Sequence, residues 1–438
     1  MISARKMIAA AAMLFVPFSA NGMTLSEAFD QAAKHDPAIP QSLAVYESER
    51  YLGRQVSGAR LPQINATGQI ARAYSRSEAE LFPSGRGDGV IRNAGVELRQ
   101  PLFRRDWLAR GRQADALDER AEVGRDDRIQ LMILRVAERY FAVLREREAL
   151  DLARAEMQAL ETALNDTRNR HQAGVVAVTD LREAQARFDL ARAGALRAES
   201  ALASAQDALH EITDRGYVEL PELRHDMTLP ALQPQTAEGW LEISREHSLV
   251  LREAKEDLAI ARAELSSRRS DYSPRLDAIA AYRYDDTLDF PDGQERRDRL
   301  FGVELTVPLY NGGVARARSK EAAFRAEAAA AQVQRLTLEN DRLIRQLFRD
   351  VEADRTQVEA LELAVVSAES AREATDNGYQ AGTRTILDLL DAETRLADAQ
   401  RNYADARFGL LLNTLNLRYQ SGILAPDDLR AMDVLLTE

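Results

Sequence analysis

The sequence predicts a mainly helical chain with a smaller β component, built by duplication of one half-protein. The first sign is an internal repeat, because residues 171–181 return as 379–389, and residues 95–102 return as 302–309. The second is a seven-residue spacing of apolar residues in long stretches, and the third is a two-residue spacing in four short segments. A repeat of about 208 residues is far longer than a solenoid unit, so it indicates two copies of a structural half.

The first residues are typical of a secretory signal peptide. Arg5 and Lys6 give a positive start, an apolar stretch follows as far as Phe18, and small residues before Met23 offer a cleavage site. We therefore expect residues 1–22 to be removed from the mature chain. Polar residues follow at once, which disfavours the alternative of a buried or membrane-anchoring helix. No later segment has the roughly 18 uncharged apolar residues of a membrane-spanning helix.

The composition excludes several classes of site. The chain has no cysteine, so disulfides, thiolate metal sites and a lipid-modified N-terminal cysteine are excluded. Its five histidines are scattered without helical pairing, and no nucleotide loop, nucleophile motif or metal-ligand cluster is present. We therefore expect no catalytic activity, no metal and no cofactor. The net charge of -12 argues against nucleic acid as a partner.

Two long helical hairpins are expected to dominate the structure. Residues 108–171 contain no proline and are rich in strong helix formers, so they predict one helix of roughly 96 Å at ~1.5 Å per residue. A glycine turn follows, a second helix returns from about Leu181 to Leu209, and the second copy repeats the pattern to Leu417. The seven-residue spacing is seen at Ile129, Val136, Val143, Leu150, Met157 and Leu164. This spacing predicts coiled-coil packing, and helices this long must bury their apolar stripe in an oligomer.

Two shorter helical runs, residues 25–58 and 237–269, precede the β segments and are expected to continue the returning helices end to end. Proline and glycine gather between the two copies and predict a linker there. The expected organisation is a signal peptide at 1–22, a first repeat at 23–215, an equatorial linker at 216–236, a second repeat at 237–420 and a C-terminal tail at 421–438.

Four segments have the two-residue period of half-buried strands, and they lie at about 64–70, 92–98, 276–284 and 301–306. Strands of about ten residues with apolar and polar faces are typical of a membrane β-barrel, although a soluble β-hairpin cap has a similar alternation. Polar segments at 75–89 and 285–299 are expected to be outer loops. Aromatic residues just beyond the strand ends, at Phe103, Trp107 and Tyr310, suit an interfacial girdle. Because about eight strands are needed to close such a barrel, four strands also imply an oligomer.

The second hairpin tip, residues 378–392, resembles the TolC family of outer-membrane channels. Residues 174–180 and the strand-to-helix junctions at Pro101 and Pro308 are also similar. The resemblance implies a homotrimer, in which three chains with four strands each close one outer-membrane β-barrel. It also implies that this barrel is continuous with a long periplasmic coiled-coil α-helical barrel. The linker and the C-terminal tail would then form an equatorial belt.

The function implied by this resemblance is a passive exit duct of a tripartite efflux or type I secretion system. The implied partners are a periplasmic adaptor (membrane fusion) protein that docks on the helical tips, an inner-membrane RND or ABC pump, and outer-membrane lipid. An alternative from another class is a periplasmic coiled-coil adaptor or scaffold. That alternative predicts no paired amphipathic strands and a biotinyl/lipoyl-like β domain, which the sequence does not contain.

Two acidic residues at the second tip are candidate functional residues. Asp388 and Asp391 are three residues apart after the turn, so they share one helix face. The resemblance implies that they form two acidic rings in the constricted periplasmic entrance of a trimer, where they favour cations. The structural alternative is helix capping, because Thr385-x-x-Asp388 fits a capping box and an acid in a first turn favours the helix dipole.

A closed-state latch is also implied by the resemblance. Tyr379 and Arg384 of the second tip would pair with Thr179 and Asp180 of the first tip and hold the hairpin closed. An arginine–carboxylate pair suits this role because it is directional and reversible. Without the family, Arg384 would equally be a solvated loop charge.

The tip turns are expected at Gly174 and Gly382, where glycine permits a left-handed conformation. The two tips are not chemically equal, because the first copy has Ala177 where the second has Thr385.

Overall fold

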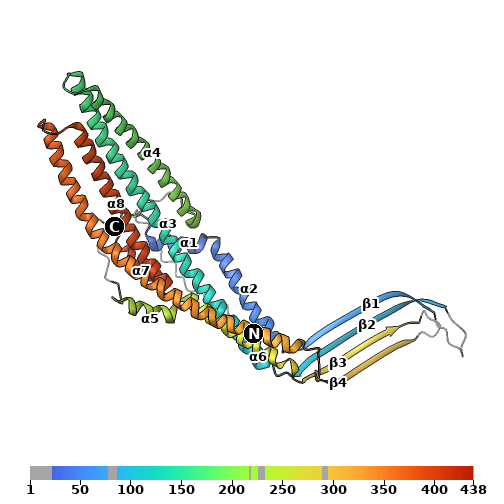
Figure 1. Cartoon of the computed structure of the whole chain (residues 1–438). Helices are drawn as coiled ribbons and strands as arrows, with labels where there is room; N and C mark the ends of the chain where they lie inside the picture. The colour runs from blue at the N-terminus through green and yellow to red at the C-terminus, as the bar shows by residue number, and fades with distance from the viewer. Residues whose placement is uncertain (1–21, 77–85, 217–218, 225–231, 289–293, 438) are drawn as a thin grey trace, which may run out of the picture.

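The computed structural model describes residues 22–437 apart from 77–85, 217–218, 225–231 and 289–293. The chain is elongated, with a β-sheet at one end and two helical hairpin tips at the other (Figure 1). The predicted signal peptide lies outside the described residues except for its last position, Gly22. No helix in the described part of the chain is both long and apolar enough to span a membrane.

Two long helices set the length of the molecule. Helix α3 (Trp107–Gln172) and helix α7 (Val314–Gln380) contain 66 and 67 residues, so each is roughly 100 Å long. Helices α4 (Val178–Thr213) and α8 (Ile386–Gln420) return beside them after short turns (Figure 1). The helix predicted over 108–171 is therefore confirmed to within one residue at either end.

Each shorter predicted run consists of two helices rather than one. The bounds are α1 (Leu25–His35), α2 (Ala38–Gly58), α5 (Ala237–His247) and α6 (Leu249–Arg269). The first break follows from Pro37, because the residue before a proline is disfavoured in the helical region. That residue, Asp36, is extended and buried, and its carboxylate pairs with Arg135 of α3. Helices α2 and α4 lie one beyond the other along α3 (Figure 1).

The second break lies beside a buried network of neutral side chains. Ser248 separates α5 from α6, and its hydroxyl lies 3.4 Å from the side-chain oxygen of Asn340 in α7. The amide nitrogen of Asn340 donates to Ser244 over 2.7 Å. The buried side chains of Ser244, Ser248 and Asn340 thus satisfy one another's hydrogen-bonding groups at the break.

The sheet has four antiparallel strands in the order β1-β2-β3-β4. They are β1 (Gln63–Arg76), β2 (Arg86–Phe103), β3 (Arg275–Asp286) and β4 (Glu295–Thr306). All four extend beyond the predicted segments, so the expected loops at 75–89 and 285–299 were drawn too long. The cross-strand hydrogen bonds of a ladder continue through polar residues, which the two-residue apolar period alone does not reveal.

The register gives the sheet one apolar and one polar side, because residues opposite each other in an antiparallel pair point to the same side. One row across the four strands is Ile64, Leu98, Ala280 and Phe301. Another row, on the other side, is Thr67, Gly95, Arg283 and Asp298. Ile64 is 70% exposed and Phe301 79% exposed, so the apolar side is uncovered within one chain.

The main hydrophobic core lies at the equator, where α1, α3, α4, α8 and the C-terminal helix α9 (Pro426–Asp433) meet. Its largest side chains, Tyr140, Phe141 and Phe408, are fully buried. The Tyr140 hydroxyl donates to the carbonyl of Met23 over 2.9 Å, which ties the start of the described chain to α3. A smaller apolar cluster packs the two hairpins together at their tips.

Candidate functional site at the two hairpin tips

The turns of the two tips have the same backbone. Gly174 has φ +77° and Gly382 has φ +75°, in the left-handed region that favours glycine. In the first tip the amide of Val175 donates to the carbonyl of Arg170 over 2.9 Å. In the second tip the amide of Thr383 donates to the carbonyl of Gly378 over 2.8 Å. Each glycine therefore ends a long helix with the hydrogen bonds of a C-terminal Schellman cap.

The second returning helix begins with a capping box. The hydroxyl of Thr385 accepts from the Asp388 amide over 3.2 Å, and the Asp388 carboxylate accepts from the Thr385 amide over 2.9 Å. The same carboxylate accepts from the Thr385 hydroxyl over 2.8 Å. Hydrogen bonds from the backbone and side chain of Thr385, together with the charge of Arg384, lower the pKa of Asp388. The capping alternative is thus realised in one chain, and it keeps the carboxylate ionised.

Asp391 lies one turn further along the same face and is held by a basic partner. Its carboxylate is 2.9 Å from the guanidinium of Arg187 in α4, and the two side chains are 40% and 30% exposed. Arg187 also pairs with Glu183 of its own helix over 3.1 Å. The sequence analysis missed Arg187, because the contact joins two helices whose facing sides are set only by packing.

Tyr379 is buried and tied to the first hairpin. Its hydroxyl donates to the carboxylate of Asp166 in α3 over 3.0 Å, and the guanidinium of Arg170 lies 4.4 Å from its ring centroid. Burial, together with the hydrogen bond and charge of Asp166, raises the pKa of this tyrosine. Within the described part of a single chain, no hydrogen bond or ion pair joins Tyr379 to Thr179 or Asp180.

Arg384 lies against the end of its own hairpin. A Cβ added to Gly378 would come within 2.8 Å of the Arg384 Cγ, so the glycine makes room for the arginine stem. The hydroxyl of Thr179 donates to the neighbouring Asp180 over 3.4 Å, so these two residues contact each other rather than Arg384. The pairing of Tyr379 and Arg384 with Thr179 and Asp180 therefore remains a prediction. Among the residues that the structure describes, no cluster of acidic and histidine side chains could hold a metal ion.

Comparisons with known proteins agree with this architecture. The family model described as "Outer membrane efflux protein" matches residues 28–214 and 240–422, one match for each copy of the repeat. The chain is 32% identical over 421 residues to outer membrane protein TolC of Vibrio cholerae, covering 94% of this chain and 92% of that protein. It is 25% identical over 429 residues to alkaline protease secretion protein AprF of Pseudomonas aeruginosa, covering 95% and 88%.

A solved structure has the same fold. The outer membrane protein VceC of Vibrio cholerae superposes with a TM-score of 0.76 at 18% identity, over 91% of this chain and 96% of that one. The predicted fold class and the internal duplication are therefore confirmed.

Proposed function

Because the chain belongs to the outer membrane efflux protein family, we infer that it is an outer-membrane channel, the exit duct of an efflux or type I secretion system. The observation that carries this function is the joining of an amphipathic four-stranded sheet to helical hairpins roughly 100 Å long. The sheet suits a bilayer and the hairpins suit the periplasm below it. The paired amphipathic strands also disfavour the alternative of a periplasmic adaptor, which does not require them.

We propose that three identical chains form the channel. Strands β1 and β4 are each paired on one side only within the chain, and four strands are about half of the smallest membrane barrel. The helices carry uncovered apolar side chains as well, among them Leu190 and Leu196 of α4 and Leu338, Leu363 and Val366 of α7. Neighbouring chains would pair the strand edges and cover these stripes at the same time.

The sidedness of the sheet supports a water-filled interior. Its apolar side would face lipid and its polar side would line the duct, as in other membrane barrels. Nothing in the sequence suggests a nucleotide site, so we propose a passive, non-catalytic duct. The energy would come from an inner-membrane RND or ABC pump, and a periplasmic adaptor would dock on the helical tips. The division into repeats at 23–215 and 237–420, joined by an equatorial linker, is part of the same proposal.

The entrance would be formed by the tips, with Asp388 and Asp391 as acidic rings. The pairing of Asp391 with Arg187 moderates one ring, and the charge of Arg384 acts on the other. Pairing of Tyr379 and Arg384 with Thr179 and Asp180 of the first tip, as the family resemblance implies, would complete the latch.

Assembly is the first test of this function. The full chain purified from outer membranes in detergent is expected to be a trimer and to form ion channels in planar bilayers. A monodisperse monomer without channel activity would contradict the proposal, because neither the strand edges nor the helix stripes would be covered.

The entrance is tested by the double variant Asp388→Ala, Asp391→Ala. Confined like charges attract cations, so the parent channel should be cation-selective and blocked by multivalent cations from the periplasmic side. The variant should lose much of both properties while remaining trimeric. The matched control is Asp189→Ala, an exposed acid of α4 away from the turn, which should leave both properties unchanged. If the double variant melts earlier with unaltered selectivity, capping is the only role of Asp388.

A further inference from the structure

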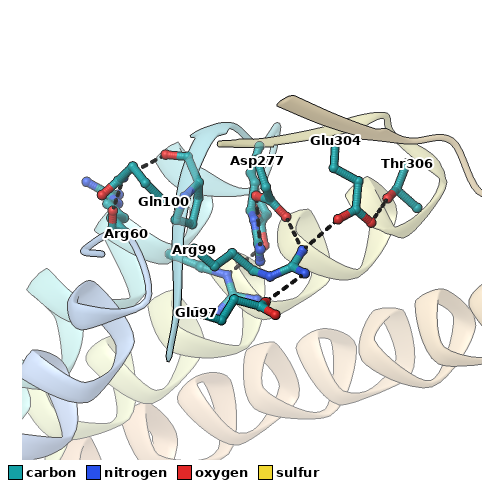
Figure 2. Close-up of polar contacts among 11 residues, drawn as sticks. Arg60, Glu97, Arg99, Gln100, Asp277, Glu304 and Thr306 are labelled. Carbon is teal, nitrogen blue, oxygen red and sulfur yellow. Dashed lines mark hydrogen bonds and ion pairs between the residues drawn. The ribbon is translucent and has the colours of Figure 1, made fainter. Parts of the chain in front are cut away.

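A cluster of charged side chains lies on the polar side of the sheet, at the end nearest the helices (Figure 2). Arg99 of β2 is its centre. The Arg99 guanidinium is 3.3 Å from Glu97 in the same strand and 3.2 Å from Glu304 in β4. It is also 3.5 Å from Asp277 in β3, so one arginine reaches carboxylates on three strands.

The members of this cluster differ in exposure. The Asp277 side chain is only 10% exposed and lies between two guanidinium groups, because Arg104 also approaches it to 3.5 Å. Arg99 and Glu97 are each 34% exposed, and Glu304 is 47% exposed. Asp277 and Arg104 therefore form a largely enclosed pair, while one guanidinium and two carboxylates remain open to solvent.

The cluster sits where the strands meet the helices. The side-chain amide of the neighbouring Gln100 donates to the carbonyl of Arg60 over 3.1 Å, between α2 and β1 (Figure 2). The Arg60 guanidinium in turn donates to the carbonyl of Trp107, the first residue of α3. These contacts fix the helix ends against the sheet, so the cluster occupies a defined level of the molecule.

We propose that Arg99 sets the charge of a collar around the duct where the barrel joins the helices, and that this collar is a second selectivity-determining level. The proposal rests on the proposed trimeric channel. Arg283 of β3 lies on the same side of the sheet, 3.9 Å from Glu97. Three copies of Arg99, Arg283, Glu97 and Glu304 therefore bring six positive and six negative charges to the wall, a net charge of zero. Without Arg99 the same wall carries -3, which favours cations in the duct.

A purely mechanical role for Arg99 is the competing explanation. The arginine joins β2, from the first repeat, to β3 and β4, from the second, so it also braces the two halves of the sheet. A brace depends on the planar fork of the guanidinium, whereas a charged wall depends only on the sign of the charge. Substitutions that separate geometry from charge therefore distinguish the two roles.

The test measures reversal potentials in a salt gradient and block by hexaamminecobalt(III) added from the outer side, using full-length trimers in planar bilayers. Arg99→Gln should raise the cation-to-anion permeability ratio several-fold and strengthen the outer-side block. Glu304→Gln should change both quantities in the opposite direction. Arg99→Lys, which keeps the charge and loses the fork, should behave like the parent channel.

The matched control is Arg297→Gln, in the same sheet. Arg297 pairs with Glu295 and lies 5.8 Å from the ring centroid of Tyr284, on the apolar side near the opposite end of the strands. The substitution Arg297→Gln removes the same positive charge, but on the side that faces away from the duct. The cation-to-anion permeability ratio should therefore not change.

Several outcomes would overturn the collar. The collar is contradicted if Arg99→Gln and Glu304→Gln both form trimers with the selectivity and block of the parent channel. It is also contradicted if Arg99→Lys behaves like Arg99→Gln. If Arg99→Gln fails to assemble, Glu304→Gln and Arg99→Lys still decide the question. A parent chain that forms no channel contradicts the proposed function instead. Arg99→Gln added to the variant that lacks both tip aspartates should still strengthen the outer-side block, since the two levels are separate.

Discussion

The two hairpin tips have the same backbone and different chemistry. Both turns place glycine at nearly the same positive φ and close with the same pattern of hydrogen bonds. The helix that follows starts with Thr385 and a capping box in the second tip, whereas Ala177 at the corresponding position offers no side-chain cap. The duplicated turn has thus been kept while the side chains around it have diverged.

The two tips also differ in the side chain that lies just before each turn. His171 of the first tip corresponds to Tyr379 of the second. The His171 ring nitrogen lies 3.0 Å from the carbonyl of Val176, inside its own turn. Tyr379 instead reaches Asp166 of the other hairpin and is 7% exposed. The second tip therefore contacts the first hairpin through Tyr379, whereas His171 contacts its own turn. A single substitution in a duplicated segment has made the two copies unequal.

The largest effect is expected from replacing either turn glycine with alanine. A left-handed conformation costs a residue with a Cβ roughly 1–2 kcal/mol. Open space surrounds both positions, so the conformational term acts alone. Gly174→Ala and Gly382→Ala should therefore raise the amide hydrogen-exchange rates of their tips by similar factors. Gly194→Ala, in the middle of α4 with equally open space, is the control and should not accelerate exchange.

If the exchange rates of the two tips rose by clearly unequal factors, the backbones of the two tips would differ in stability.

A smaller effect should separate the two helix starts. Thr385→Ala removes an N-cap and should destabilise the first turn of α8 by about 1 kcal/mol, while Ala177→Thr should stabilise the first turn of α4. Thr385→Ser is the control and should keep the cap. Hydrogen exchange of the first-turn amides measures both changes.

The pH dependence of this cap has a definite sign. The pKa of Asp388 is lowered in the folded tip, so its stabilising contribution is present above the pKa of an unfolded aspartate, about 3.9. It is lost as the pH falls through the lowered folded value. The difference between the parent and Thr385→Ala should hold at neutral pH and shrink in strong acid, and a difference that grows in acid would contradict the capping assignment.

The smallest change in stability is expected from the ion pair between the hairpins. Arg187→Gln removes the partner of Asp391, and a pair exposed to this degree contributes roughly half a kcal/mol. Its effect on transport should be easier to see, because the freed carboxylate should increase cation selectivity in planar bilayers. Arg182→Gln, an exposed arginine on the same helix, is the matched control. If Arg187→Gln and Arg182→Gln have equal cation selectivity, Arg187 does not influence ion selection at the entrance.

The sequence by itself determined the elements and their duplication. A seven-residue period, a two-residue period and glycine at a left-handed turn are local signals, so they can be recognised in the sequence without knowledge of the packing. The long helices, the four strands and both tip turns were predicted for this reason. Pro37 also carried a local signal for the break between α1 and α2, which the prediction of one continuous run overlooked.

The tertiary structure decided which charges meet. Arg187 and Asp391 are 204 residues apart, Tyr379 and Asp166 are 213 apart, and Arg99 and Glu304 are 205 apart. Each pair depends on which faces of two helices, or which rows of neighbouring strands, come together. That choice is made by the burial of apolar stripes along the whole length of the hairpins and by strand register. A short polar motif contains no information about either, so the partners of its charged residues appear only when the chain is folded.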